Sequence, residues 1–176
     1  MASRRDTAIR EFTVAALDAE ASSAAALCAL LGVAEPVSWP PDYNDADTRA
    51  WFRAQLATRP DAAGWLGYYV VAGIDGVPTL VGTAGYKGPP DREGMVEIGY
   101  SVVKTYRRRG IATAALELLL ERAFNDARVV TVSAETPTGF AASRGLLEKC
   151  GFVIAGASHD PEAGDLVVYA LRRSAA

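Results

Sequence analysis

The order of its secondary-structure patterns constrains this chain most, because strand-like and helix-like repeats occupy different stretches. In the middle, three runs rich in Val, Tyr and Gly are separated by short connections, at Trp65–Ala72, Leu80–Tyr86 and Met95–Val103. Such spacing predicts antiparallel strands joined as a meander, with a turn at Asp75-Gly76. Beyond residue 104 helical and strand patterns alternate, which predicts a parallel crossover. We therefore expect an α+β fold with a mixed, mostly antiparallel central sheet of six to seven strands flanked by about four helices.

Apolar periodicity, capping residues and helix-ending glycines set the other boundaries. The expected elements are a strand at Ile9–Ala15, a helix from the N-cap Asp18 to Leu31, a helix from Asn44 or Asp45 to just before Pro60, a helix from Arg109–Gly110 through Ala123, a strand at Val129–Ala134, a helix at Ala141–Cys150, and a hairpin of Phe152–Ala155 with Leu166–Leu171. Gly32 and Gly151 follow predicted helices, where a left-handed residue ends them. The hairpin loop is expected at His159–Gly164.

Length and composition favour one domain, residues 1–176. Half of the residues are hydrophobic and 22% are charged, which suffices for a buried core. The net charge of −3 argues against a general nucleic-acid binder, which needs many Lys and Arg contacts to phosphate. No apolar stretch approaches the roughly 18 residues of a membrane span, and Met1–Arg10 lacks a signal peptide, so we expect a cytoplasmic protein without a membrane partner. Cys28 and Cys150 are expected to be buried free thiols, and with a single His159 no metal site is expected.

A cationic junction between a strand and a helix, Val102–Thr113, gives the strongest functional signal. Three arginines, Arg107–Arg109, stand just before the start of the predicted helix. The first N–H groups of a helix lack intrahelical partners and carry the positive end of the helix dipole, so the junction predicts an anion site. Gly110 lets a diphosphate approach the backbone closely, and the guanidinium groups can fork onto phosphate oxygens. A solvated basic turn is the alternative, which the position between strand and helix disfavours.

The run Arg107-Arg108-Arg109-Gly110-Ile111-Ala112 resembles the signature Arg/Gln-x-x-Gly-x-Gly/Ala of the GNAT superfamily of N-acetyltransferases. The resemblance continues upstream in Val96–Val102 and downstream, through Glu135-Thr136, in Ala142–Phe152. That last run is similar to the branch of the ribosomal-protein alanine acetyltransferases, in which a Ser precedes Leu-Glu-Lys-x-Gly-Phe. Similarity covers residues 78–156, and the order of elements fits nearly the whole chain. The motifs are specific for the superfamily and are poor guides to substrate.

The resemblance implies a GNAT-like sheet and acetyl-coenzyme A as cosubstrate. Backbone amides of Arg108–Thr113 would hold the pyrophosphate. The strand around Tyr100–Val103 would splay from the next one, with a bulge at Gly99, and bind the pantetheine arm through free backbone groups. The expected cofactor-binding residues are Tyr100, Ser101, Val102, Val103, Arg107, Arg108, Arg109, Gly110, Ile111, Ala112, Thr113, Phe140 and Ser143.

Glu97 is the expected general base. It interrupts an apolar strand on the face of Gly99 and Ser101, where a carboxylate would suit proton abstraction from the amine, directly or through water. An exposed Glu opposite a cation is the alternative. A backbone N–H near Val102 is the expected oxyanion donor.

Ser143 is the expected residue at the coenzyme A thiol, as general acid or as a hydrogen-bond partner of the sulfur. Many relatives carry a Tyr in this helix, whereas this chain has Leu147, which cannot donate. An ordinary helix-start Ser is the alternative. Phe140 stands where relatives have an Asn that bonds the pantetheine, so the arm would be held differently or more weakly.

The expected function is acetyl transfer by direct attack to a primary amine, either a protein N-terminus or a small molecule. The acceptor pocket is expected between the N-terminal helices and the Tyr86–Gly94 loop. Its candidate residues are Trp39, Trp51, Phe52, Tyr68, Tyr86, Asp42 and Asp45, although such aromatics more often belong to a core and such Asp residues more often cap helices.

Two other functions and the oligomeric state complete the expectations. A non-catalytic acyl-coenzyme A sensor is the alternative that Phe140 and the missing Tyr favour. A flavodoxin-like nucleotide binder is disfavoured by the hairpins at 65–103. A homodimer that pairs Leu166–Leu171 across the interface and a monomer both stay open.

Overall fold

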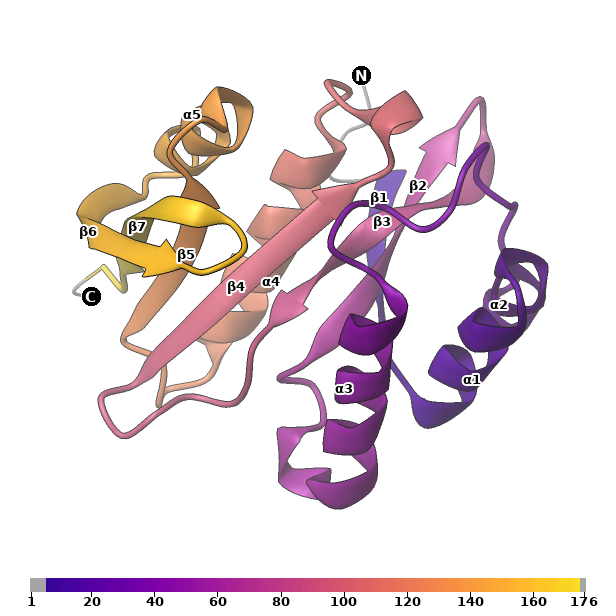
Figure 1. Ribbon diagram of the computed structural model, residues 1–176, viewed down its shortest axis with the longest axis horizontal. Coiled ribbons are helices and arrows are strands. Elements are labelled where there is room, and N and C mark those ends of the chain that lie inside the picture. Colours follow the sequence, from indigo (N-terminus) through magenta and orange to yellow (C-terminus); the bar gives the residue numbers. More distant parts are fainter. Residues whose placement is uncertain (1–5, 175–176) are drawn as a thin grey trace.

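A single seven-stranded sheet organises the computed structural model, which describes residues 6–174 (Figure 1). The strands lie in the order β1-β2-β3-β4-β5-β7-β6, and five α-helices occur among the described residues. The elements are β1 Thr7–Glu11, α1 Val14–Ser22, α2 Ala24–Leu31, α3 Ala46–Thr58, β2 Gly67–Ile74, β3 Val77–Tyr86, β4 Met95–Val102, α4 Ile111–Asn125, β5 Thr131–Pro137, α5 Ala141–Lys149, β6 Val153–Asp160 and β7 Gly164–Arg172, with short 3-10 turns at Pro60–Ala62 and Lys104–Tyr106. The predicted α+β class and the mostly antiparallel sheet are confirmed.

The N-terminal helix differs from the prediction in its start and in its continuity. Thr13 caps it, since the Thr13 hydroxyl accepts from Ala16 N at 3.0 Å, five residues before the predicted cap Asp18. Ser23 then adopts an extended conformation and its hydroxyl accepts from Ala26 N, which ends α1 and starts α2. The apolar periodicity predicted one helix here, but Ser23 can cap a helix and therefore divides it into α1 and α2.

The central meander follows the prediction, with strand ends shifted by a few residues. Antiparallel pairs β1–β2, β2–β3 and β3–β4 hold it together. Asp75 and Gly76 both have positive φ, at 51° and 81°, as a two-residue hairpin turn between β2 and β3 requires. The Asp45 cap of α3 and the left-handed Gly32 and Gly151 are also confirmed.

The second half contains the predicted parallel crossover, with α4 between the parallel strands β4 and β5. The final hairpin is tighter than predicted: β6 runs on to Asp160, whose carboxylate accepts from Glu162 N and Ala163 N in the turn. β7 then lies between β5 and β6. The prediction that Leu166–Leu171 pairs across a dimer is wrong, because β5 and β6 occupy the two edges of β7 and β6 forms the edge of the sheet.

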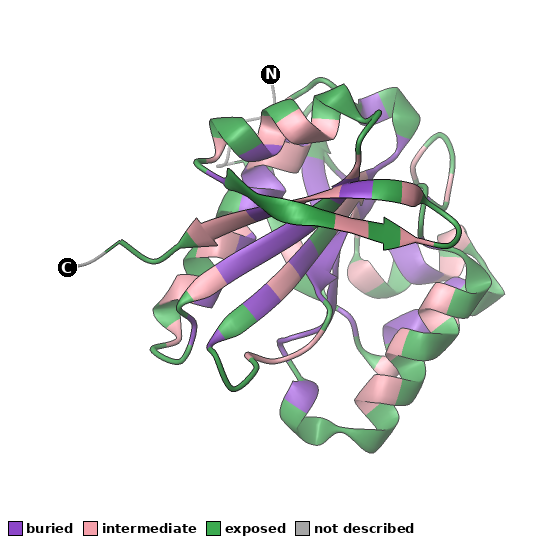
Figure 2. Cartoon of the chain, turned by 60° about the vertical axis from the view of Figure 1, so that its left-hand side comes forward, coloured by how far each residue is buried: buried purple, intermediate pink, exposed green. Residues whose placement is uncertain are grey.

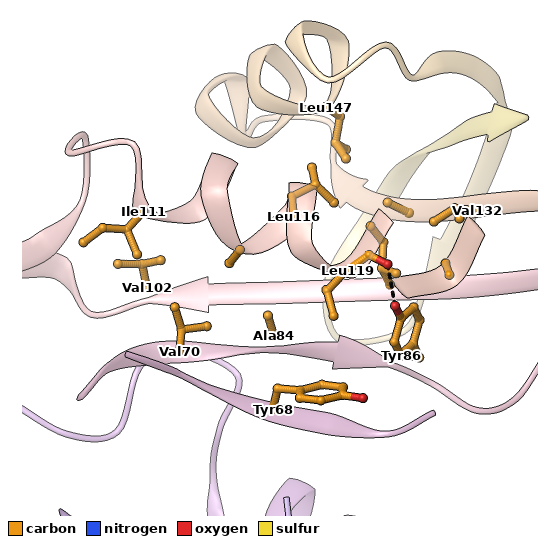
Figure 3. Close-up of a cluster of buried hydrophobic side chains, with 14 of the residues drawn as sticks. Tyr68, Val70, Ala84, Tyr86, Val102, Ile111, Leu116, Leu119, Val132 and Leu147 are labelled. Atoms are coloured by element: carbon orange, nitrogen blue, oxygen red, sulfur yellow. Dashed lines mark hydrogen bonds between the residues drawn. The ribbon is translucent and has the colours of Figure 1, made fainter. Parts of the chain in front are cut away.

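Helices cover both faces of the sheet, and each face has its own core. On one face α4 and α5 contribute Leu116, Leu119 and Leu147 to a cluster with strand residues such as Val132 (Figure 3). The Tyr86 hydroxyl reaches through this cluster and donates to the Leu119 carbonyl oxygen. On the other face, α1–α3 cover β1–β3 with a smaller cluster. Buried residues accordingly gather on the central strands and exposed ones on the outer helix surfaces (Figure 2).

Candidate functional site

The start of α4 is the first component of the site. Gly110 takes a left-handed conformation with φ 83° and no side chain caps the helix. The first backbone bond that closes the helix is Ala114 N to Gly110 O, at 3.0 Å. Among residues 6–174, the amides of Ile111, Ala112 and Thr113 therefore have no protein partner, as expected for an uncapped helix start. Such a group of free amides suits a diphosphate.

Arg107 differs from the other two arginines of this junction. Its Nε donates to Val102 O at 2.8 Å, and its Nη2 donates to Asp42 Oδ2 at 2.7 Å. Its guanidinium thus bonds two protein groups. It does not face the phosphate site, although the sequence suggested that position for all three arginines. Arg108 and Arg109 are exposed, and Arg109 lies 5.8 Å from the centre of the Tyr106 ring. Direct side-chain contact with phosphate is therefore expected of these two alone.

The divergence of β4 and β5 is the second component. The two strands pair only from Met95–Ile98 to Thr131–Ala134, after which β4 stays on β3 and β5 stays on β7 (Figure 1). The splay occurs as expected, yet the bulge expected at Gly99 is absent. The β3–β4 register is regular from Ile98 to Val102, so the sheet separates without an extra residue in β4.

The separated edge of β4 presents free backbone groups. Val103 N bonds Val81 O of β3, and backbone groups alternate sides along a strand. The Val102 N–H and C=O consequently face the open side, where β5 has turned away. Arg107 occupies that carbonyl, which leaves the Val102 N–H as a free donor at the opening. This is the amide that the sequence reasoning expected to stabilise an oxyanion.

Glu97 lies beside this opening on the face away from α4. It stands in register with Ser133 of β5, and its side chain is 30% exposed. The Lys87 ammonium lies against Glu97 Oε1 as an ion pair. The structure thus contains the cation that the alternative reading required, and the pair would have to open before that oxygen could accept a proton.

Glu135 is a carboxylate that sequence reasoning did not single out. Because Glu97 and Ser133 share a face in the parallel register, strand alternation puts Glu135, two residues further along β5, on the same face as Glu97. Glu135 is exposed, and its Oε1 accepts from the Ser158 hydroxyl of β6 at 2.9 Å. Alternation from Ser133 was the signal that could have found it, once the β4–β5 register was known.

On the opposite face, Ser143 is joined to β4 through Tyr100. The two hydroxyl oxygens are 3.0 Å apart, and burial raises the pKa of Tyr100 above its usual value. Phe140 is 49% exposed at the start of α5, whereas Leu147 is fully buried in the core. The structure therefore brings Tyr100 and Ser143 together and leaves Phe140 at the surface.

The expected acceptor-pocket residues do not gather in one pocket. Tyr68 and Tyr86 are buried on the α4 face, and the Trp39 indole donates to Glu20, so these rings serve the core. Phe52 packs edge-to-face on Phe12. The remaining candidates are Trp51, which is exposed, Asp42, which pairs with Arg107 and Lys104, and Asp45, which caps α3.

Free amides at a crossover helix, next to two diverging parallel strands, form the candidate site of this α+β protein. A family model described as the acetyltransferase (GNAT) domain matches residues 9–153. The chain therefore belongs to the GNAT acetyltransferase family. Among residues 6–174, no helix is both long and apolar enough to cross a membrane, and no group of three or more His, Cys, Asp or Glu residues is arranged to hold a metal.

Individual relatives agree with the family. The uncharacterized N-acetyltransferase YjdG of Bacillus subtilis (strain 168) is 35% identical over 75 residues, which are 43% of this chain and 45% of that protein. The match thus spans less than half of that relative's length. Among solved structures, RimL, a ribosomal L7/L12 alpha-N-protein acetyltransferase in complex with coenzyme A, has a TM-score of 0.68 at 15% identity, covering 95% of this chain and 94% of that one. A GNAT-family acetyltransferase from Bacillus anthracis has a TM-score of 0.62 at 20% identity, covering 98% and 96%. Likeness at such identities shows the fold.

Proposed function

We propose that this chain transfers the acetyl group of acetyl-coenzyme A to a primary amine by direct attack in a ternary complex, with residues 1–176 acting as one domain. One observation carries the proposal: the free amides of Ile111–Thr113 lie just beyond the strand whose edge β5 leaves open. A diphosphate on those amides and an extended arm along β4 use the two sets of unpaired backbone groups together.

Each residue of the site has a task in this proposal. Arg108 and Arg109 add charge at the diphosphate, and Tyr100–Val103 line the pantetheine arm. The Val102 N–H donates to the carbonyl oxygen as negative charge develops on it. Acetyl-coenzyme A, as the substrate, supplies the thioester.

Glu97 accepts the proton of the attacking amine, directly or through water, from the face away from α4. The acceptor belongs on that face, where Glu97 and Glu135 both lie. RimL is described as an acetyltransferase of a protein N-terminus, and for this chain we propose a peptide N-terminus or a small amine, in the cytoplasm.

Two measurements test the proposal. Calorimetry should show coenzyme A binding, and a thiol-release assay with acetyl-coenzyme A and a panel of amines and N-terminal peptides should show turnover. The double variant Arg109→Glu with Gly110→Asp puts two negative charges at the amides and should reduce affinity at least about 100-fold, because charged hydrogen bonds and the helix dipole each contribute. Unchanged affinity in that variant would remove the diphosphate seat from the proposal. Binding without turnover on any acceptor would favour the sensor function.

A further inference from the structure

A hydrogen bond links β4 to α5 at the Tyr100 hydroxyl. Tyr100 Oη lies 3.0 Å from Ser143 Oγ and 3.5 Å from the Ser143 carbonyl oxygen. The sequence suggested a cofactor contact for Tyr100 and a role at the thiol for Ser143, without a link between them. The structure makes them one polar pair in an otherwise apolar layer that includes Ile98 and Val102.

Tyr100 stands where the two parallel strands separate. Ile98 and Ala134 are the last residues that pair between β4 and β5. Two residues further on, Tyr100 is the first side chain beyond the paired region that points to the α4–α5 face, since alternate residues share a face. Continued pairing would have put Thr136 opposite it, but β4 and β5 have diverged there. The phenol therefore lies at the opening on the α5 side, across the sheet from Glu97.

The phenol keeps its proton in this environment. Burial raises the pKa of Tyr100, and the hydrogen bond with Ser143 opposes that rise only in part. The 3.5 Å contact to the Ser143 carbonyl oxygen is longer than an ordinary O–H···O hydrogen bond. When Ser143 Oγ donates to Tyr100 Oη, the phenol proton has no good acceptor among the described residues and can point into the opening.

We infer that Tyr100 is the proton donor to the sulfur of coenzyme A, with Ser143 holding its hydroxyl in place; this inference rests on the function proposed above. As the amine nitrogen bonds the thioester carbon, the carbon–sulfur bond breaks and its electron pair stays on sulfur. The proton moves from Tyr100 Oη to that sulfur, which releases a free thiol. The base takes a proton from the nitrogen that has become acetylated and passes it to water. Tyr100 Oη then regains a proton from water. One proton leaves the amine and one joins the sulfur.

The first test measures binding and needs no turnover. Coenzyme A and desulfo-coenzyme A, which lacks the thiol, are titrated into the wild type and Tyr100→Phe. A lost hydrogen bond to sulfur should weaken coenzyme A by about 5- to 10-fold in the variant, while desulfo-coenzyme A changes less than about 2-fold. Equal weakening of both ligands, or none of either, overturns the contact.

The second test uses a matched tyrosine. The Tyr169 hydroxyl also meets α5, where it donates to Glu148 Oε1 at 2.8 Å, but it has no bond to Ser143. Tyr100→Phe should lower kcat about 100-fold at a nearly constant KM for acetyl-coenzyme A, as expected for a lost general acid, while Tyr169→Phe retains kcat. Ser143→Ala should give a smaller loss than Tyr100→Phe, because Ser143 acts through Tyr100.

The outcomes separate this inference from the proposed function. A wild type that binds neither ligand contradicts both. In a second outcome, the wild type binds and turns over while Tyr100→Phe keeps both its kcat and its preference for coenzyme A over desulfo-coenzyme A. That result supports the proposed function and overturns the role of Tyr100.

Discussion

Arg107 and Asp42, 65 residues apart in the sequence, form an ion pair in which Nη2 donates to Oδ2 at 2.7 Å. Because Arg107 Nε also holds the Val102 carbonyl, the pair ties the segment before α3 to the end of β4. This arginine of the phosphate motif therefore shapes the opening from the protein side. The Val37 N–H, also before α3, donates to the Tyr106 hydroxyl and ties this segment to the 3-10 turn that follows β4.

We predict that Asp42 and Arg107 are coupled in stability. Arg107→Lys keeps the charge but cannot reach both partners, and should cost about 1 kcal/mol in urea unfolding. In a double-mutant cycle with Asp42→Asn, the coupling should be about 0.5 kcal/mol, since both side chains are partly exposed. The Arg107 hydrogen bond lowers the pKa of Asp42, so this coupling should persist at neutral pH and vanish as the pH falls below the usual range of an Asp. Additive single-mutant effects at pH 7 would refute it.

The ion pair between Lys87 and Glu97 leads to a prediction about the base. Glu97→Gln should lower kcat about 100-fold while coenzyme A affinity stays the same, because a general base contributes in that range. The matched variant Lys87→Met removes the cation and should leave kcat within about 3-fold, since it frees the carboxylate. If both variants lose activity equally, Glu97 serves the ion pair. A large loss in Glu135→Gln with none in Glu97→Gln would move the base to β5.

A buried carboxylate at Glu20 organises the segment that carries Asp42. Its oxygens accept from Trp39 Nε1 at 2.8 Å, from Asn44 Nδ2 at 2.7 Å and from the Tyr69 hydroxyl at 2.7 Å. Glu20→Gln places an amide N–H2 group against these donors and should destabilise the fold by about 2–4 kcal/mol. Asp18→Asn in the same helix is the control: its partner Arg53 is solvent-exposed, so its unfolding midpoint should change little. Similar midpoints for the two variants would contradict the network.

The buried Tyr68 provides a pH test of the core. Burial raises its pKa to about 12, and its hydroxyl donates to Gly64 O at 2.7 Å. A phenol whose folded pKa lies above its unfolded value of 10.0 stabilises the fold below that value and loses this stabilisation as the pH rises towards 12. Wild-type stability should therefore fall between these two pH values more steeply than that of Tyr68→Phe, with a difference on the order of 2 kcal/mol. Parallel stability curves would show that Tyr68 ionises freely.

The types and spacing of neighbouring residues were enough to predict the secondary-structure elements and the anion site at the start of α4. The strand spacing at 65–103, the Asp75-Gly76 turn and the left-handed Gly110 are properties of a few adjacent residues, and the sequence contains them directly. Errors arose where short-range signals competed. Ser23 interrupted an apolar helix, and Asp160 shortened a loop, because each side chain accepts hydrogen bonds from nearby backbone N–H groups. Apolar periodicity contains no information about such bonds.

Tertiary structure alone decided which partners the site residues have. The sequence determined that amides at 111–113 start a helix without a cap, because capping depends on neighbours within four residues. It did not determine that Asp42 holds Arg107, that Lys87 pairs with Glu97, or that Tyr100 meets Ser143 43 residues away. Lys87 meets Glu97 through the antiparallel β3–β4 register, and Tyr100 meets Ser143 just beyond the point where the β4–β5 pairing stops. Asp42 meets Arg107 because the segment before α3 packs against the junction between β4 and α4. All three contacts depend on segments distant in the sequence packing together or pairing across the sheet.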